Sequence, residues 1–433
     1  MELNPSYSLS FTHSDLSGKT LQSGEAKAIL DSRTLAITKN NQAISIPYFE
    51  IQGIVDENYS VALFLSSGEK ITLNQIGYEY ENFLSNLYKN RNELLLKYML
   101  MEEANLAAGI ESNYQYSDEY GDERQGICEA RIYESAVVIL PKKTEPVRIP
   151  LSYINDFSLE DYTFTLTTES KQKLNLSQMG EKTDFFNRSL IKAFDEMKLR
   201  TLKLLVDAFP EIDQQKLRLV IPFFSDGKSV SRSQIESISP PLWLSIEKKI
   251  QNSGLNEEYN HLKSLSNQGE IWVGIKRGLM GEMTGEYIWF MTPIFSEDPN
   301  QPGNALIIEA ASEQDSGIAT YIFRIMDREI YRKGIQEQFM RQEAHKFMNK
   351  TNQCMIEINF RREPIYLSED KLLEPENEKY LYATKKLDSL KHLRKQFIGR
   401  IIHSSPEQWN KSLEGLLTFN IRSIDNEEKW RRS

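Results

Sequence analysis

The sequence predicts an α+β protein in which two similar β-rich units, each followed by a helix, precede a third region of strands and helices. The stretch "EKITLNQIG" at residues 69–77 recurs as "QKLNLSQMG" at residues 172–180. After each of these stretches the spacing of the apolar residues changes from that of a strand to that of a helix. Apolar segments typical of strands, followed by helical patterns, return after residue 269.

Length and composition indicate an ordinary globular protein. A chain of 433 residues has room for about three domains. With 40% apolar and 26% charged residues, the composition differs from that of chains that stay disordered. The formal charge of −10 gives no overall attraction to nucleic acid or to an anionic membrane, so such binding would need a local patch.

The distribution of cysteine and histidine argues against metal and disulfide sites. Cys128 and Cys354 lie far apart, and neither has a second cysteine at the spacing of a zinc site. The five histidines are dispersed, with no HExxH pattern, so we expect no metal and no cofactor. The first residues lack a basic segment followed by an apolar run, and no later stretch approaches the roughly 20 apolar residues of a membrane span. These features predict a cytoplasmic protein.

The first unit has the alternation and the punctuation of an antiparallel sheet. Short segments rich in β-branched and apolar residues are separated by turn residues such as Asp31-Ser32 and Ser66-Ser67-Gly68. After Gly77, apolar residues recur at intervals of three and four, which predicts a helix that covers one face of the sheet. The expected strands are 26–30, 35–38, 43–46, 51–55, 59–65 and 71–73.

A second copy of this unit follows at a spacing of 103 residues. Pro47 corresponds to Pro150, and Gly77 corresponds to Gly180, where a residue without a Cβ suits the corner between strand and helix. The two prolines are expected at a sheet edge, because proline cannot donate to an interior ladder. Farther upstream, Ile29 is expected to match Ile132 at the same unbroken spacing.

Several strands closed by one C-terminal helix, in about 100 residues, resemble the pleckstrin-homology-like superfold. The resemblance covers residues 25–101 and 126–205, and it concerns element order alone. It implies a bent, seven-stranded antiparallel sandwich in each copy. The seventh strand of the first copy is expected at residues 7–11, whereas its counterpart in the second copy is left open. A small β-barrel with an appended helix is the alternative fold.

The predicted organisation has five parts. Residues 1–104 form the first pleckstrin-homology-like module, 105–125 an acidic linker, 126–208 the second module, 209–268 a helical connector and 269–433 an α+β C-terminal domain. In the last part we expect strands at 270–275, 287–291, 305–309 and 319–325, and helices at 327–349 and 378–402. Because strands again precede a helix, a third, diverged module is an alternative for this region.

Two groups of basic residues are the candidate binding sites. Pleckstrin-homology-like domains that bind phosphoinositides need a cationic cluster after the first strand, and neither copy has one. The second copy carries Lys142 and Lys143 in the next turn, with Arg148 beyond them. The late predicted helix combines an apolar stripe with a basic face. This face comprises Lys385, Lys386, Lys391, Arg394, Lys395 and Arg400.

No catalytic constellation is visible, so we expect no catalytic residues. The sequence contains no GxSxG, no Walker lysine motif and no GxGxxG after a strand. Two similar modules suit a function carried out by surfaces, because linked weak contacts add through effective concentration. We therefore predict a non-enzymatic scaffold that binds another protein. The alternatives are a peripheral membrane adaptor that uses the late basic helix, and an enzyme with its site in the C-terminal region.

Overall fold

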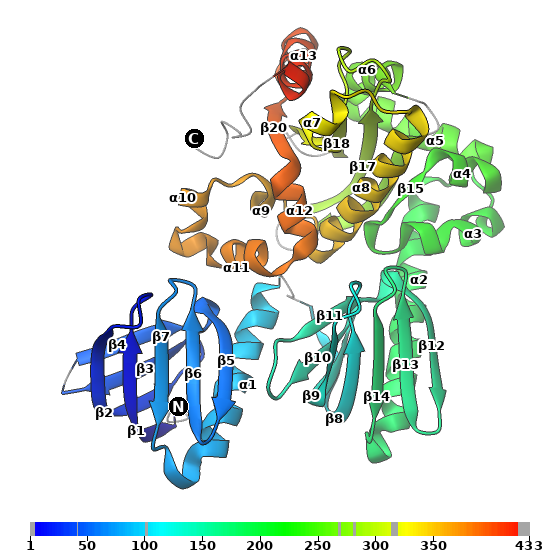
Figure 1. The fold of residues 1–433 in the computed structure, drawn as a ribbon. Helices are drawn as coiled ribbons and strands as arrows, with labels where there is room; N and C mark the ends of the chain where they lie inside the picture. The colour runs from blue at the N-terminus through cyan, green and yellow to red at the C-terminus, as the bar shows by residue number, and fades with distance from the viewer. Residues whose placement is uncertain are drawn as a thin grey trace. The chain divides into compact units, whose positions relative to one another are not determined.

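The computed structural model describes residues 5–40, 42–99, 103–266, 270–279, 283–312 and 319–422. The chain divides into two compact units, Met1–Leu190 and Ile191–Ser433. Three antiparallel sheets and their helices make an α+β protein, as predicted. The first two sheets belong to the first unit, and the third belongs to the second unit (Figure 1).

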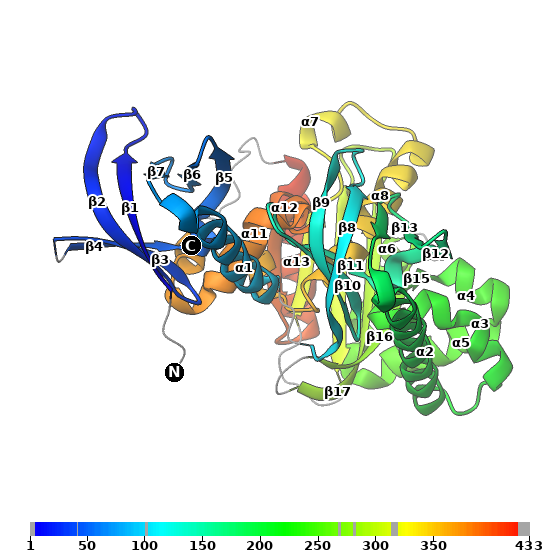
Figure 2. The ribbon, with the colours of Figure 1, turned by 90° about the horizontal axis from the view of Figure 1, so that it is seen from below.

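The first sheet contains seven strands in the order β4-β3-β2-β1-β7-β6-β5. Its edge strands are β4, which ends at Pro47, and β5, so the expected place of this proline at an edge is confirmed. Figure 2 shows the strong curvature of β1 and β2. Helix α1 (Tyr80–Tyr98) follows the last strand. The strands are β1 (Ser6–Ser14), β2 (Thr20–Leu30), β3 (Thr34–Lys39), β4 (Gln42–Pro47), β5 (Ile51–Glu57), β6 (Ser60–Leu65) and β7 (Lys70–Asn74).

The second sheet repeats this order with β11-β10-β9-β8-β14-β13-β12. Helix α2 (Thr183–Ala208) follows it. We call residues 6–98 the first module and residues 105–182 the second module. The strands are β8 (Asn105–Ser117), β9 (Glu123–Tyr133), β10 (Ala136–Pro141), β11 (Val147–Pro150), β12 (Ile154–Glu160), β13 (Thr163–Thr168) and β14 (Lys173–Ser177).

The corner between the last strand and the helix is alike in the two modules. Gly77 and Gly180 have φ of 71° and 58°, so the left-handed backbone expected at these glycines is present. Two residues before each glycine, Gln75 and Gln178 also lie in the left-handed region, with φ of 57° and 59°. A short 3₁₀ turn, Gly77–Glu79 or Gly180–Lys182, then leads into the helix.

The expected unbroken spacing of 103 residues is wrong in strands β2 and β3. Leu30 pairs with Leu35 in the first sheet, whereas Ile132 pairs with Val137 in the second, so equivalent positions there are 102 residues apart. Ile29 is 36% exposed and Ile132 is fully buried, which shows that they are not equivalent. The β10–β11 connection is one residue longer than the β3–β4 connection, which restores the spacing of 103 from Pro47 and Pro150 onward. Short matching segments could not reveal this local shift.

The predicted acidic linker, residues 105–125, is wrong for most of its length. Residues 105–117 form β8, which lies between β9 and β14 and provides the seventh strand of the second sheet. Tyr114 and Tyr116 are buried, whereas Tyr120 is exposed. Polar residues fill the outward positions of this strand and hide its alternation.

The β5–β6 and β12–β13 turns place a tyrosine in the left-handed region. Asn58 and Tyr59 have φ of 51° and 59°, and Asp161 and Tyr162 have φ of 47° and 59°. Two consecutive residues of this kind form the turn that suits the twist of a hairpin, where glycine is the usual second residue. Both tyrosines are exposed, by 78% and 81%.

Replacement of Tyr162 by glycine is expected to stabilise the second sheet by about 1 kcal/mol, because the left-handed backbone is unfavourable for a residue with a Cβ. Tyr59→Gly should stabilise the first sheet by less, because it also removes the contact of Tyr59 with Tyr80, whose ring centroids are 5.4 Å apart. Amide hydrogen exchange of residues 154–168 and 51–65 in the full-length chain measures both effects. Weaker protection in Tyr162→Gly would contradict the strain at this turn.

The third sheet has six strands in the sequential order β15-β16-β17-β18-β19-β20. This meander differs from the order of the first two sheets, so the region is not a third module of the same topology. The four strands predicted after residue 269 are present. The strands are β15 (Ser229–Ser231), β16 (Trp272–Leu279), β17 (Met283–Ile294), β18 (Ala305–Ser312), β19 (Ala319–Arg324) and β20 (Phe397–Ile402).

Helices cover this sheet, and the expected connector is mostly helical in its described part, residues 209–266, which also contains strand β15. Helix α5 starts with two prolines, as predicted, because their missing N–H groups lie in the first helical turn. Helix α8 runs across the third sheet in Figure 1. The helices are α3 (Gln214–Phe224), α4 (Arg232–Ile238), α5 (Pro240–Ile250), α6 (Asn256–Leu265), α7 (Arg328–Tyr331), α8 (Glu337–Glu357), α9 (Glu363–Tyr366), α10 (Glu369–Leu372), α11 (Glu378–Lys386), α12 (Asp388–Gln396) and α13 (Pro406–Arg422).

The single late helix expected at residues 378–402 is wrong. Helix α11 ends before Leu387, whose extended backbone separates it from α12. From Phe397 the chain continues as β20, which pairs with β19. Alternating apolar residues in this segment complete the sheet, and tertiary pairing outweighs the helical spacing. Within the described residues no helix is both long enough and apolar enough to span a bilayer.

Candidate functional site

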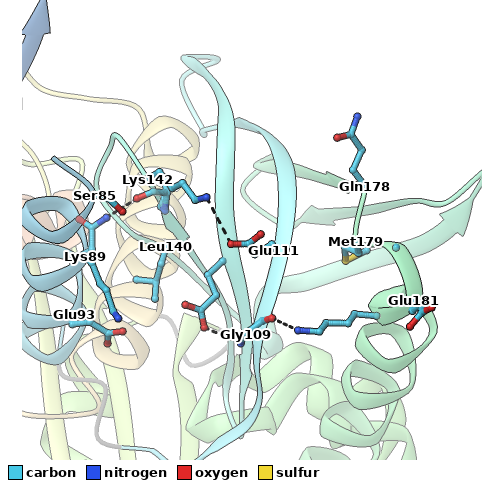
Figure 3. Close-up of a pocket in the computed structure, with 15 residues that line it drawn as sticks. Ser85, Lys89, Glu93, Gly109, Glu111, Leu140, Lys142, Gln178, Met179 and Glu181 are labelled. Atoms are coloured by element: carbon cyan, nitrogen blue, oxygen red, sulfur yellow. Dashed lines mark hydrogen bonds and ion pairs between the residues drawn. The ribbon is translucent and has the colours of Figure 1, made fainter. Parts of the chain in front are cut away.

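A groove of about 720 Å³ in the first unit is the candidate site (Figure 3). Helix α1 provides one wall with Ser85, Lys89, Asn92 and Glu93, whose spacing places them on one helical face. The second module provides the other wall from β8, β9, the end of β10 and the β14–α2 corner. The residues of this wall are Gly109, Glu111, Glu129, Leu140, Pro141, Lys142, Gln178, Met179, Gly180, Glu181 and Lys182.

Contacts between the two modules fix the α1 wall. The Arg91 guanidinium is buried and donates to the carbonyl of Ile51 at 2.9 Å and to Oε1 of Glu145 at 2.7 Å. The side-chain amide of Asn92 donates to the carbonyls of Pro141 and Thr144 at 2.8 and 2.9 Å. Because these hydrogen bonds are largely shielded from water, they hold the 141–145 loop against α1.

Arg131 links the floor of the groove to α1. Its guanidinium donates to Oε1 of Glu129 at 2.8 Å and to Oε1 of Glu93 at 2.5 Å. Glu129 also accepts from the backbone N–H of Gly109 at 2.8 Å. The hydrogen bond from Arg131 holds the pKa of Glu129 below its usual range, so this carboxylate stays ionised at neutral pH.

Lysine and glutamate side chains both line the groove. Lys142 Nζ lies 3.7 Å from Oε1 of Glu111, and Lys182 Nζ donates to the carbonyl of Gly109 at 2.5 Å. Lys89 is exposed and has no ion pair with a carboxylate in the described part of the chain. Leu140 and Met179 add apolar surface between these charges. The groove therefore presents both signs of charge together with a small apolar surface.

A groove occupies the same place in the first module. It has a volume of about 660 Å³, and its lining includes Ser8, Lys27 and Gln75. Ser8 and Gln75 stand 103 residues before Glu111 and Gln178 of the second groove, and Lys27 stands 102 residues before Glu129. Both grooves thus lie beside the corner where the last strand meets the helix. In the second module α1 adds a further wall.

The titratable side chains that line the second groove are lysines and glutamates, and its described lining includes no histidine, cysteine or aspartate. Among the residues that the structure describes, no cluster of histidine, cysteine, aspartate or glutamate is able to hold a metal ion. Cys128 and Cys354 are buried, and burial raises the pKa of the Cys128 thiol to about 12, so this thiol is unreactive at neutral pH.

The candidate residues of the second module are not brought together. Lys142 lines the groove, whereas Lys143 donates from Nζ to Oδ2 of Asp56 in the first module at 2.8 Å. Arg148 lies half-buried in β11. Each of the two lysines faces a carboxylate, which is unfavourable for a phosphate site formed by this turn.

The candidates of the late basic face are divided between two helices and strand β20, which carries Arg400. Lys385 and Lys386 end α11, while Lys391 and Lys395 are exposed on α12. Arg394 is buried and donates to the carbonyl of Pro364 at 2.8 Å, so it supports the fold and is not part of a surface. A continuous basic face is therefore absent from these residues.

Sequence reasoning missed most of the groove, because Lys89, Glu129 and Lys182 come from three separate segments. The recurrence of Gln75-x-Gly77 as Gln178-x-Gly180 is the one signal that marked its position. No protein-family model and no curated protein matches the chain.

Arg131→Gln is expected to raise the pKa of Glu129 toward its ordinary value of about 4.3, because the main hydrogen bond to the ionised carboxylate is lost. The depressed pKa stabilises the folded second module above pH about 4.3, and this stabilisation disappears as the pH falls through the lowered value. The variant should lose this pH dependence. Carboxyl-detected NMR titration of Glu129 measures the shift.

Arg124→Gln is the matched control, since Arg124 lies in the same strand with its guanidinium 5.9 Å from the Tyr116 ring. An unchanged pKa of Glu129 in Arg131→Gln would show that Arg131 does not determine the charge of the groove floor.

Proposed function

We propose that the chain is a non-enzymatic scaffold that binds another protein through the groove between α1 and the second module. The observation that carries this proposal is the recurrence of a groove beside the strand-to-helix corner of both modules. In the second module the groove is bounded by a helix that a network of buried hydrogen bonds fixes in place. Preorganised walls reduce the ordering entropy that binding would otherwise require.

The fold part of the proposal is that each module is pleckstrin-homology-like. The strand order β4-β3-β2-β1-β7-β6-β5 and its repetition in β11-β10-β9-β8-β14-β13-β12 support it. A helix follows the last strand in each case. This arrangement leaves the groove corner accessible in both copies.

The charge of the lining favours a polypeptide over a polyanion. The groove contains four glutamates, Glu93, Glu111, Glu129 and Glu181, and three lysines, Lys89, Lys142 and Lys182. Four carboxylates would repel a phosphoinositide or a nucleic acid backbone. A protein segment carries both signs of charge together with backbone donors and acceptors, so it matches the rim and the floor.

A charge swap across the groove tests this function. Lys89→Glu combined with Glu181→Lys keeps the net charge but reverses the pattern, and both side chains are exposed. The full-length protein is used for affinity purification from its native host, and the proteins retained by the wild type are then titrated individually. We expect the swap to weaken the affinity for the specific partner by about tenfold or more, because mispaired charges at an interface oppose binding.

The control swap is Lys171→Glu with Glu160→Lys, which makes the same change at exposed positions of the β13–β14 turn and of β12 that do not line the groove. This control should bind as the wild type does. Equal binding by the groove swap, or a wild type that retains no partner selectively, would refute the proposal.

A further inference from the structure

Two arginines and two tyrosines meet at the β20 edge of the third sheet, far in sequence from the groove. Tyr321 of β19 and Arg400 of β20 are directly paired across the two strands. Cross-strand partners project from the same face of a sheet, so their side chains are neighbours. Tyr321 is 5% exposed, whereas Arg400 is exposed on the edge strand.

Helix α9 and the residue before it complete the cluster. Tyr366 lies beside Tyr321 with ring centroids 6.1 Å apart. The Arg400 guanidinium lies 4.1 Å from the centroid of Tyr366, and the Arg362 guanidinium lies 5.7 Å from that of Tyr321. Stacking on a ring orients a guanidinium without using its N–H donors, which stay in the plane of the group. One of the Arg400 donors is hydrogen-bonded to the Tyr321 hydroxyl.

The two guanidinium groups of this cluster are positively charged at neutral pH. In the described residues neither Arg362 nor Arg400 forms an ion pair, in contrast to Arg341 and Arg394 of the same unit. Burial raises the pKa of Tyr321 despite the nearby charges of Arg362 and Arg400, so its hydroxyl keeps its proton at neutral pH. The hydroxyl remains a donor beside the two cations.

Backbone strain precedes the segment that carries Arg362. Asn359 and Phe360 have φ of 49° and 59° and are both buried. The Phe360 N–H donates to the carbonyl of Met355 at 2.8 Å, and its ring packs edge-on against Trp289 with centroids 5.6 Å apart. A bulky residue persists in this conformation only where its surroundings enforce it, and such strain collects at functional segments.

We propose that Arg362, Arg400 and the Tyr321 hydroxyl form a binding site for a phosphate monoester. A single carboxylate is satisfied by one guanidinium fork, whereas a phosphate dianion has three free oxygens and accepts from two forks and a hydroxyl together. The exposed edge of β20 leaves the outer side of Arg400 open to solvent, so the ester group of the ligand has room there. No covalent step is involved.

Titration of the full-length protein with inorganic phosphate, phenyl phosphate and acetate tests this site, with calorimetry and phosphorus NMR as readouts. We expect both phosphates to bind more tightly than acetate. For phenyl phosphate, affinity should fall below pH about 6, where the ester dianion takes up a proton. Arg400→Gln and Arg362→Gln should each weaken phosphate binding by about tenfold, the effect of a lost hydrogen bond to a charged group. Arg400→Lys should be intermediate, because lysine keeps the charge but lacks the fork.

Lys379→Gln is the matched control, because Lys379 Nζ lies 5.0 Å from the centroid of Tyr380 and the change removes one cation over a tyrosine elsewhere in this unit. It should bind phosphate as the wild type does. A third arm uses vesicles that contain phosphatidic acid, the lipid that carries the same group. Binding of phenyl phosphate without vesicle binding identifies a soluble ester, and Arg-dependent vesicle binding identifies a lipid source.

The proposal is overturned if the wild type binds phosphate no better than acetate, or if Arg362→Gln/Arg400→Gln binds phosphate unchanged. Circular dichroism of this double variant establishes that it is folded. Because the groove lies in Met1–Leu190 and this cluster in Ile191–Ser433, failure of one test leaves the other unaffected.

Discussion

His403→Ala is expected to lower the free energy of unfolding of the second unit by about 3 kcal/mol or more, the range found when one partner of a buried ion pair is removed. Glu309 is fully buried, and its Oε2 lies 3.2 Å from Nε2 of His403. Glu258 Oε1 lies 3.5 Å from Nδ1 of the same ring. Without the imidazole, two carboxyl groups remain with little access to water.

The Thr320 hydroxyl is already hydrogen-bonded, so it cannot take over the role of His403 beside Glu309. Thr320 Oγ1 donates to Oε2 of Glu309 at 2.5 Å and accepts from Nε1 of Trp409 at 2.7 Å. His403 Nε2 lies 2.9 Å from the same hydroxyl. The network thus joins β18, β19 and α13, and its disruption affects all three elements.

Chemical denaturation of the full-length chain, followed by hydrogen exchange of α13 and β19, measures the loss. His403→Gln keeps a hydrogen-bonding side chain without the charge and should lose less. The double variant His403→Gln/Glu309→Gln should recover part of the difference, because no buried carboxylate remains at position 309. A loss below about 1 kcal/mol in His403→Ala would exclude a strong buried pair.

The same histidine gives the second unit a characteristic pH dependence. Burial alone would lower the pKa of His403, but the hydrogen bond to Glu309 and the charges of Glu309 and Glu258 raise it. A raised pKa stabilises the folded state below the unfolded value of about 6.5, and this contribution is lost as the pH rises through the folded value. His392 has a lowered pKa because of its burial, so its effect has the opposite sign. Comparison of wild type and His403→Gln across this range isolates the His403 contribution.

Gly274→Ala is expected to destabilise the third sheet by about 3 kcal/mol, at the upper end of the cost of overpacking a core. Gly274 lies in β16, where an added Cβ would lie 2.2 Å from Nε1 of Trp289 and 2.6 Å from the carbonyl oxygen of Gly227. These two groups are hydrogen-bonded to each other at 2.8 Å. The methyl group therefore displaces the indole and breaks a buried hydrogen bond.

Gly415→Ala is the matched control in the same unit. Gly415 is exposed within α13, and an added Cβ would meet no atom within 4 Å. This substitution should stabilise the helix by about 0.5 to 1 kcal/mol. Tryptophan fluorescence during denaturation reports both changes, and a Gly274→Ala protein as stable as the wild type would contradict the close packing at β16.

Local patterns determined how far the fold was predictable from sequence. Strands β2–β7 and helix α1 were predicted because their apolar residues keep one period over the whole element. The failures occurred where long-range pairing overrides that period. Phe397 continues the helical stripe of α12, but it lies in β20 and pairs with Phe323 of β19. Tyr114 and Tyr116 were assigned to a linker because their outward neighbours are polar, although both are buried in β8.

The candidate site was less predictable than the fold. Lys142 was identified from its position in a turn, but its neighbours in the groove come from α1, β8, β9 and the β14–α2 corner. The Glu309, Thr320 and His403 network joins residues that are 11 to 94 positions apart. Glutamate and lysine are common surface residues, so their types alone carry no positional information.

The β3–β4 and β10–β11 hairpins of the two modules differ in length, and this difference makes the contact between the modules asymmetric. Strands β3 and β4 pair as far as Lys39 and Gln42, whereas β10 and β11 pair only as far as Ile139 and Val147. The longer loop of the second module contacts α1 through Thr144 and Glu145, and it contacts β5 through Lys143. Since the hairpin of the first module lacks this extension, the contact between the two modules is asymmetric: the β10–β11 loop of the second module contacts the helix of the first.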